Sequence, residues 1–316
     1  MTPRHLIALA VAGALLVIAV AAWGDDREAH PAAAGKPAAK PSPPVRPKVP
    51  ARRGMKAYRG AGAWVDQYDG DILDGPSPAL QEMHAHGVRT VFLETGSWRL
   101  PEERDFRDRD GDELIVDQAH ALGMKVVAWY LPGLDDVPLD MRRTRAALDM
   151  RTERGGRFDG FAADIESQRV RSLRARNAAL MRYSRALRRA AGARYALGAI
   201  IPDARSATVA PGLWPGLPYR ALAPIYDVFL PMAYPTARGH GAGFVYRYSR
   251  ANVKFVRAVT RRPVHLIGGV DPHLLAGEPA AVVRGARDAG AIGASFYDFA
   301  GAQDASWRAL RAFGGR

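Results

Sequence analysis

The chain has 316 residues, a formal net charge of +13 and no cysteine. The absence of cysteine excludes disulfides, thiolate nucleophiles and zinc–thiolate sites. An apolar share of 48% and a charged share of 24% are those of a globular protein with a sizeable core. The histidines show no metal-ligand spacing, so the sequence predicts no metal site and no cofactor.

Residues 1–23 are predicted to be a signal peptide or a membrane anchor. Arg4 precedes an uncharged apolar run from Leu6 to Trp23, and acids follow the run. The run is long for a cleaved signal and short for a membrane span, so cleavage and anchoring both stay open. Either way we expect export, as a secreted or cell-surface protein that meets a membrane only through this segment.

Residues 24–53 are rich in Ala, Pro and Lys and are predicted to be a disordered linker. Such a segment buries too little apolar surface to offset its ordering entropy, and its prolines favour an extended spacer. Of the net charge, +5 lies in the first 53 residues and +8 in the domain predicted over 54–316.

From residue 54 onward, eight short β-rich runs alternate with helical segments. The strands are predicted over 62–68, 89–95, 125–131, 158–166, 195–202, 226–234, 264–270 and 292–299. The helices are predicted over 77–87, 113–123, 169–194, 251–260, 280–290 and 305–315. The charged segment 104–114 is interpreted as a solvated loop, and the Gly-rich segment 234–248 as a mobile flap or a flexible connection.

This alternation predicts an α/β fold with a single (β/α)8 TIM barrel. A doubly wound open sheet is the alternative, but no Gly-rich phosphate-binding turn follows the first strand. In (β/α)8 barrels the active site lies at the C-terminal ends of the strands.

The Arg-rich segment 169–194 has apolar residues at helical spacing. Its arginines form either a solvated helix face or a patch for an anionic cell-wall polymer, and both interpretations stay open. We expect no nucleic-acid partner, because no nucleic-acid-binding motif is present.

Acids and aromatic residues recur at the predicted strand ends. This combination suits a carbohydrate site, since rings stack on the CH-rich faces of sugars and carboxylates bind hydroxyls. The substrate-binding residues predicted in this way are Asp66, Glu94, Trp98, Trp129, Tyr130, Tyr297 and Asp298.

The segment "FDGFAADIES" at 158–167 places two carboxylates at the end of a predicted strand. Alternation puts Asp164 and Glu166 on one face, toward the barrel mouth. Two carboxylates in a partly dry site resist ionising together, so one keeps the proton that a glycosidase needs for its general acid. We predict Glu166 as the acid, with Asp164 orienting it and stabilising positive charge on the sugar. The alternative is a structural pair bonded to loop amides and to arginines such as Arg169.

Two segments resemble family 18 glycoside hydrolases, the chitinases and their relatives. "DGFAADIE" at 159–166 resembles the fourth-strand signature Asp-Gly-x-Asp-x-Asp-x-Glu. The matching residues are Asp159, Gly160, Asp164 and Glu166. "LPMAYPT" at 230–236 is similar to the Met-x-Tyr segment of the sixth strand, and places Met232 and Tyr234 at the barrel mouth.

The resemblance implies retaining, substrate-assisted hydrolysis of N-acetylhexosamine polymers. In this scheme Glu166 is the acid/base, Asp164 steadies the acetamido group of the substrate, and Tyr234 bonds to that group. Met232 would lie beside them in the substrate-binding site.

Three positions depart from the family's pattern. The middle aspartate is Ala162, the aspartate after Met-x-Tyr is Pro235, and the last strand has Phe296 and Tyr297 where Trp is usual. Without the acetamido route, a second carboxylate must act as nucleophile or base. The candidates are Asp66, Glu94 and Asp298, and retention or inversion of configuration stays open.

The sequence therefore predicts an exported glycoside hydrolase that acts on a cell-surface or extracellular polysaccharide or oligosaccharide, with Glu166 as acid/base. The alternative is a non-catalytic barrel that binds glycan through its aromatic residues. The two differ in whether a second functional group lies within reach of the sugar held by Glu166.

Overall fold

The computed structural model describes residues 54–204, 213–235, 238–269 and 274–313. Eight parallel strands pair in chain order, and the first pairs with the last to close a barrel. The strands are β1 Gly60–Val65, β2 Thr90–Ser97, β3 Lys125–Leu131, β4 Gly160–Asp164, β5 Leu197–Pro202, β6 Val228–Ala233, β7 His265–Gly269 and β8 Gly293–Tyr297. The predicted (β/α)8 barrel is confirmed. The signal or anchor and the linker lie outside the described residues.

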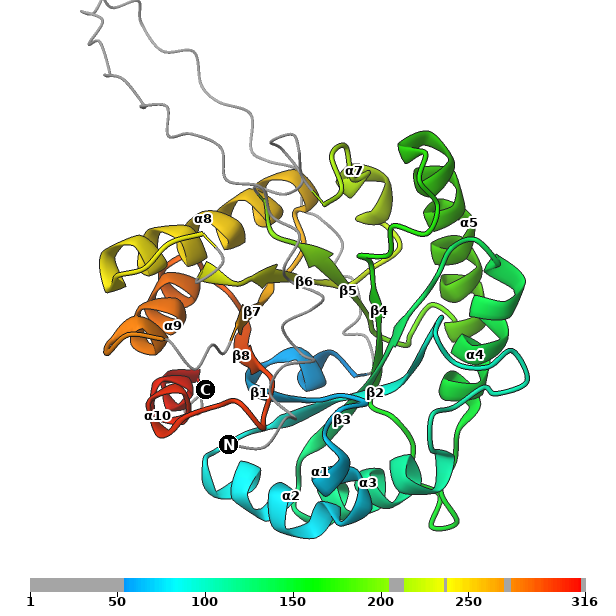
Figure 1. Cartoon of the computed structure of the whole chain (residues 1–316), viewed down its shortest axis with the longest axis horizontal. Coiled ribbons are helices and arrows are strands. Elements are labelled where there is room, and N and C mark those ends of the chain that lie inside the picture. The colour runs from blue at the N-terminus through cyan, green and yellow to red at the C-terminus, as the bar shows by residue number, and fades with distance from the viewer. Residues whose placement is uncertain (1–53, 205–212, 236–237, 270–273, 314–316) are drawn as a thin grey trace, which may run out of the picture. The chain divides into compact units, whose positions relative to one another are not determined.

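Helices surround the barrel (Figure 1). They are α1 Gly70–Asp74, α2 Pro76–Ala85, α3 Arg109–Ala121, α4 Val137–Asp149, α5 Leu173–Ala191, α7 Tyr219–Leu222, α8 Ala242–Thr260, α9 Glu278–Asp288 and α10 Asp304–Leu310. Short 3-10 turns occur at η3 Met55–Tyr58 and η5 Arg311–Phe313. Within the described ranges, none of the helices has both the length and the apolar composition of a membrane span.

Two segments predicted as loops are partly helical. The Asp108 side chain caps α3 by accepting a hydrogen bond from the Gly111 N–H at 3.1 Å, so the helix includes the second half of 104–114. Asp112 in its first turn is fully buried and not solvated. Likewise, residues 242–248 of the predicted flap form the first turns of α8. Both predictions were wrong for these residues, because charge and glycine content masked the helical period.

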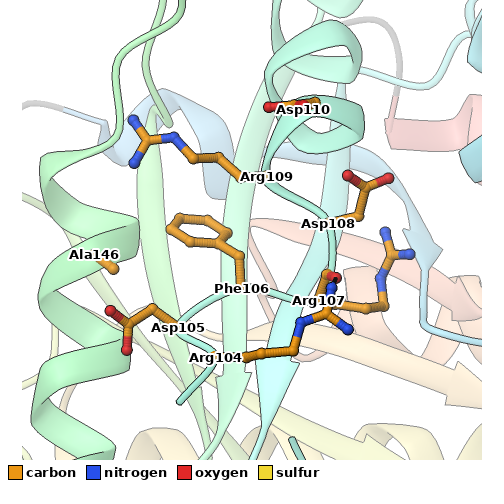
Figure 2. A pocket seen from close by; sticks show the side chains of 8 residues that line it. All are labelled: Arg104, Asp105, Phe106, Arg107, Asp108, Arg109, Asp110 and Ala146. Atoms are coloured by element: carbon orange, nitrogen blue, oxygen red, sulfur yellow. Dashed lines mark hydrogen bonds between the residues drawn. The ribbon is translucent and has the colours of Figure 1, made fainter. Parts of the chain in front are cut away.

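The first half of the 104–114 segment remains a loop between β2 and α3. Residues 104–110 and Ala146 line a surface cavity of about 430 Å³, with Phe106 among acidic and basic side chains (Figure 2). No residue of the predicted site lines this cavity.

Alternation along the strands separates an interior core from an outer core. In β4, Ala162 lies in the barrel interior, whereas Phe161, Ala163 and Ile165 pack toward the helices. The predicted facing of this strand is therefore confirmed. Asp164 is two residues beyond Ala162, so its side chain lies on the same face, at the C-terminal end of the strand.

The interior is filled with side chains below the mouth. The rings of Trp64 and Phe92 stack at 4.4 Å, and a Cβ at Gly62 would lie 2.6 Å from the Phe92 ring, so glycine is required there. Trp64 Nε1 donates to Ser295 Oγ at 2.8 Å, and Ser295 Oγ lies 2.9 Å from His265 Nε2. In (β/α)8 barrels with such a packed interior, a ligand is expected at the C-terminal rim.

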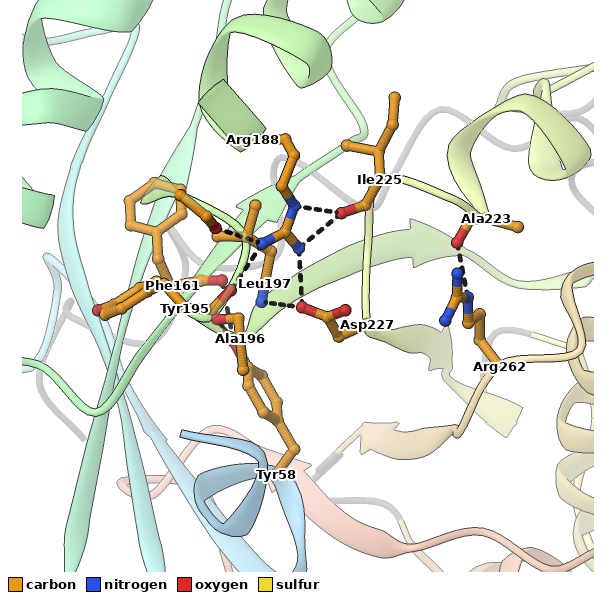
Figure 3. Close-up of polar contacts among 11 residues, drawn as sticks. Tyr58, Phe161, Arg188, Tyr195, Ala196, Leu197, Ala223, Ile225, Asp227 and Arg262 are labelled. Carbon is orange, nitrogen blue, oxygen red and sulfur yellow. Dashed lines mark hydrogen bonds and ion pairs between the residues drawn. The ribbon is translucent and has the colours of Figure 1, made fainter. Parts of the chain in front are cut away.

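Arg188 fastens α5 to the barrel. Its guanidinium donates to the carbonyls of Ile225 and Tyr195 and pairs with Asp227 at 2.7 Å, and Asp227 accepts from the Leu197 N–H at 2.9 Å (Figure 3). This arginine of the Arg-rich segment is therefore structural. The network fixes α5 against the N-terminal ends of β5 and β6, opposite the mouth.

Candidate active site

The turn after β1 organises three carboxyl groups. The Tyr68 N–H donates to Asp66 Oδ1 at 2.7 Å, and the Asp66 N–H donates to Asp69 Oδ2 at 2.9 Å. The Gln67 N–H donates to Glu94 Oε2 of β2 at 3.0 Å. Backbone donors thus hold Asp66, Asp69 and Glu94 together although all three are buried. Asp69, a strand-end acid with no predicted role, is part of the same cluster.

Two of these carboxyls have strongly raised pKa values. Burial raises the pKa of Asp69 to about 7, and the nearby Asp66 carboxylate adds to the rise. Burial also raises the pKa of Glu94 to about 7, again with a contribution from Asp66, while Arg107 and Arg99 oppose it. Near neutral pH both groups can therefore hold or release a proton.

Asp164 and Glu166 lie across the mouth at the exit of β4. Asp164 is the last residue of the strand, and Glu166 follows it in a turn with its side chain half-buried. Burial raises the pKa of both; the charge of Glu166 raises that of Asp164 further, and Arg99 opposes the rise at Glu166. Oδ1 of Asp164 is buried and has no hydrogen-bond partner among the described residues. Arg169 pairs with Asp135 at 2.6 Å and not with either carboxyl.

Two tyrosines follow at the exits of β6 and β8, Tyr234 and Tyr297. Tyr234 follows β6, and burial and then the charges of Glu166 and Asp164 raise the pKa of its hydroxyl. A Cβ at position 269 would lie 2.9 Å from the Tyr234 ring, so Gly269 makes room for it. Tyr297 donates a hydrogen bond to Asp66 Oδ2, and its ring centroid is 6.3 Å from that of Tyr234.

Asp298 completes the group of acids. Its side chain is half-buried after β8, and Oδ1 accepts a hydrogen bond from the Gly301 N–H at 2.8 Å. Burial raises its pKa, with a contribution from Asp66. We call this group the mouth carboxyls, from the exits of β1, β2, β4 and β8: Asp66, Asp69, Glu94, Asp164, Glu166 and Asp298.

The predicted aromatic residues divide into two groups. Trp129, together with the half-buried Met232, belongs to the interior layer beneath the mouth. The ring centroids of Trp129 and Trp64 are 5.9 Å apart. Trp98 is half-buried at the rim, with the guanidinium of Arg169 over its ring at 4.3 Å. An arginine therefore already occupies part of the ring surface predicted to bind sugar.

The structure does not bring Tyr130 to the site. It lies in the outer core with 1% of its surface exposed, and its hydroxyl donates to Asp140 Oδ1 at 2.8 Å. Successive strand residues point to opposite faces, so Trp129 and Tyr130 cannot both face the mouth. The substrate-binding role predicted for Tyr130 is corrected accordingly.

The arrangement suits acid/base chemistry on a polar substrate. Protonated and ionised carboxyls lie close enough to shift one another's pKa values, and the charges of one pair also raise the pKa of a tyrosine hydroxyl. In the described part of the chain, no three His, Asp or Glu side chains are grouped as metal ligands.

Solved structures with a similar fold include a mannanase, chitinases and a spore cortex-lytic enzyme. An endo-β-1,4-mannanase from Thermotoga petrophila matches with a TM-score of 0.63 and 11% identity, over 83% of this chain and 77% of that chain. A plant class V chitinase mutant from Cycas revoluta, in complex with (GlcNAc)3, matches with a TM-score of 0.60 and 12% identity, over 81% and 99%. The spore cortex-lytic enzyme SleL from Bacillus cereus matches with a TM-score of 0.59 and 10% identity, over 81% and 74%.

No family model and no curated protein matches the sequence. At these identities the likeness concerns the fold. The chain has the (β/α)8 barrel fold of glycoside hydrolases that include chitinases and a mannanase.

Proposed function

We propose that this protein is an exported glycoside hydrolase with Glu166 as its general acid/base. The observation that carries the proposal is the Asp164–Glu166 pair at the exit of β4, where burial and mutual charge favour one shared proton. The charges of both carboxyls act on the Tyr234 hydroxyl, which supports the role that the resemblance to family 18 implies for it. The shared fold of the mannanase and the chitinases supports the same class of reaction.

In the proposed reaction, the Glu166 proton passes to the glycosidic oxygen as the bond to the anomeric carbon breaks. Asp164 and Tyr234 stabilise positive charge that develops on the sugar. Water then supplies the hydroxyl group that ends on the anomeric carbon, and its second proton returns to a carboxylate.

A second protein carboxylate fits this site better than the acetamido route. Ala162 is fully buried in the apolar interior, in register with Trp129 on one side and Gly198 on the other. A Cβ at Gly198 would lie 3.2 Å from the Ala162 Cβ, so little space surrounds this position. With no aspartate there to act on Asp164, the proposal assigns the nucleophile or base to Asp66, Glu94 or Asp298.

The test is reducing-end release by the purified full chain on chitin, peptidoglycan, deacetylated and neutral glycans. Replacement of Glu166 by Gln is expected to lower the rate by about 10²- to 10⁴-fold, because the leaving oxygen loses its proton donor. The matched control is Glu153→Gln, an exposed carboxyl in the loop before β4. Equal rates for parent and E166Q protein on the cleaved glycan would contradict the proposal.

A glycan-binding barrel without activity is the second candidate, favoured by the aromatic residues at and beneath the mouth. It predicts that parent and E166Q protein bind one glycan equally and that neither releases reducing ends. Export, as a secreted or cell-surface protein, belongs to the proposal and rests on the N-terminal sequence.

A further inference from the structure

Within the part of the chain that the structure describes, the mouth carboxyls make no ion pair. Among the described residues, none of the six lies within 4.0 Å of a nitrogen of Lys, Arg or His. Acids elsewhere in the barrel do pair, such as Asp227 with Arg188 at 2.7 Å and Asp159 with Lys125 at 3.1 Å. Arg99 and Arg107 act on Glu94 and Glu166 only from beyond 4.0 Å. The six acids outnumber these two arginines, so the described part of the mouth has a local excess of acid on a domain whose net charge is +8.

A buried atom in the mouth also lacks a donor. Asp164 is 7% exposed, and its Oδ1 has no hydrogen-bond partner among the described residues. A buried carboxylate oxygen without a partner costs free energy, which a ligand that brings a donor would offset. The donors already present, such as the N–H groups of Gln67 and Tyr68, are used by Glu94 and Asp66.

An ammonium group complements these acceptors. It carries three donors, no acceptor and one positive charge, so it pairs with carboxylates both by hydrogen bonds and by charge. A sugar hydroxyl provides one donor without charge, and an anionic sugar would be repelled by the same carboxylates.

The packing around Ala162 is consistent with the same substrate. The residue that the resemblance relates to an acetamido-assisted reaction is absent, and the position is packed with apolar neighbours. A sugar with a free amino group has no acetamido oxygen to contribute, so it would not need that residue. Its hydrolysis would use one of the additional carboxyls instead.

We infer that the mouth selects a glycan with unsubstituted amino groups, whose ammonium groups lie among the mouth carboxyls. This inference rests on the proposed function, since it names the substrate class of the same site. The raised pKa values of Asp69 and Glu94 are consistent with it, because a bound cation would replace protons that these carboxyls otherwise hold.

The experiment compares two probes that differ only in N-acetylation, the hexamer of β-1,4-glucosamine and the hexamer of β-1,4-N-acetylglucosamine. Binding to full-length E166Q protein is measured by calorimetry, and cleavage is measured with the parent. We expect the deacetylated hexamer to bind at least about tenfold more tightly at low salt, and to lose this advantage as sodium chloride screens the charges. Equal or tighter binding of the acetylated hexamer, or no binding of either, would overturn the inference.

Matched variants locate the effect. In the E166Q background, Asp298→Asn removes one mouth charge and is expected to reduce the preference for the deacetylated hexamer by about fivefold to tenfold. The control is Asp304→Asn, an exposed acid at the start of α10, which should leave the preference unchanged. An equal effect of the two variants would mean that net charge, and not the mouth, sets the preference.

The two proposals fail in different ways. Cleavage of an acetylated or neutral glycan that depends on Glu166, without preference for amino groups, would retain the hydrolase and reject the inference. Selective, salt-sensitive binding of the deacetylated hexamer without any cleavage would retain the inference and reject the hydrolase.

Discussion

Glu94 shows how burial at the mouth affects stability. Its folded-state pKa of about 7 lies above the ordinary value of 4.5, so the folded protein binds this proton more tightly than the unfolded chain does. The resulting stability is fully present below pH 4.5 and is lost as the pH rises toward 7. Asp69, with a pKa raised to about 7, acts in the same direction.

We therefore predict that Glu94→Gln weakens the loss of stability between pH 5 and pH 8. The amide cannot ionise, so no buried charge develops as the pH rises. Between pH 5 and pH 8, the unfolding temperature Tm of the variant should fall by at least about 2 °C less than that of the parent. The exposed Glu103→Gln variant should follow the parent, and a Glu94→Gln profile parallel to the parent's would contradict the assignment.

At the scale of elements, the loop from β3 to α4 depends on one carboxylate. Asp140 accepts hydrogen bonds from the Tyr130 hydroxyl at 2.8 Å, the Gly133 N–H at 3.0 Å and the Leu134 N–H at 2.8 Å. Leu134 has a φ of 67°, a left-handed conformation that is uncommon for a residue with a side chain. These bonds stabilise that conformation and the start of α4.

We predict that Asp140→Ala lowers the free energy of unfolding by on the order of 3 kcal/mol, because it leaves three donors without their acceptor. Tyr130→Phe should lower it by only about 1 kcal/mol, since a single bond is lost. Urea denaturation measures both. Glycan affinity should be unchanged in Tyr130→Phe. A loss of affinity would show that Tyr130 takes part in substrate binding.

The sequence predicted the eight strands because each is a short β-rich run. It predicted the facing of β4 because alternation along a strand is a local property. It could not decide the facing of β3, whose residues are apolar on both faces, and this led to the error at Tyr130. Helix α4 was not predicted, since its buried face combines Met141 and Ala147 with the polar residues Asp140, Arg143 and Thr144. The contacts of Asp69 with the site depend on the turn after β1, whose N–H groups bond to both Asp69 and Glu94, and no spacing in the sequence reveals this turn.

At the scale of the whole molecule, positive charge and the acidic mouth belong to different surfaces. No Asp or Glu occurs between residues 167 and 202, and α5 exposes a row of arginines that have no ion pair within the described ranges. These residues are Arg174, Arg182, Arg185 and Arg189. Positive charge is therefore concentrated on the outer face of α5 and not at the site.

We predict that this row binds an anionic wall polymer. The triple variant Arg182→Gln, Arg185→Gln and Arg189→Gln should elute from immobilised poly(glycerol phosphate) at lower salt than the parent, because fewer counterions are displaced. The control replaces three exposed cations on other elements by Gln: Lys254, Arg287 and Arg311. Equal elution of the two triple variants would show that only the total charge matters.

The hydrogen bonds inside the barrel have a direction. Burial lowers the pKa of His265 to about 4, so its ring is neutral and has one donor and one acceptor. Nδ1 lies 3.0 Å from the Tyr58 carbonyl and must donate, so Nε2 accepts from Ser295, whose Oγ accepts from Trp64. A library randomised at positions 64, 265 and 295 should therefore return replacements in compatible sets, because reversing one bond obliges its neighbours to exchange roles.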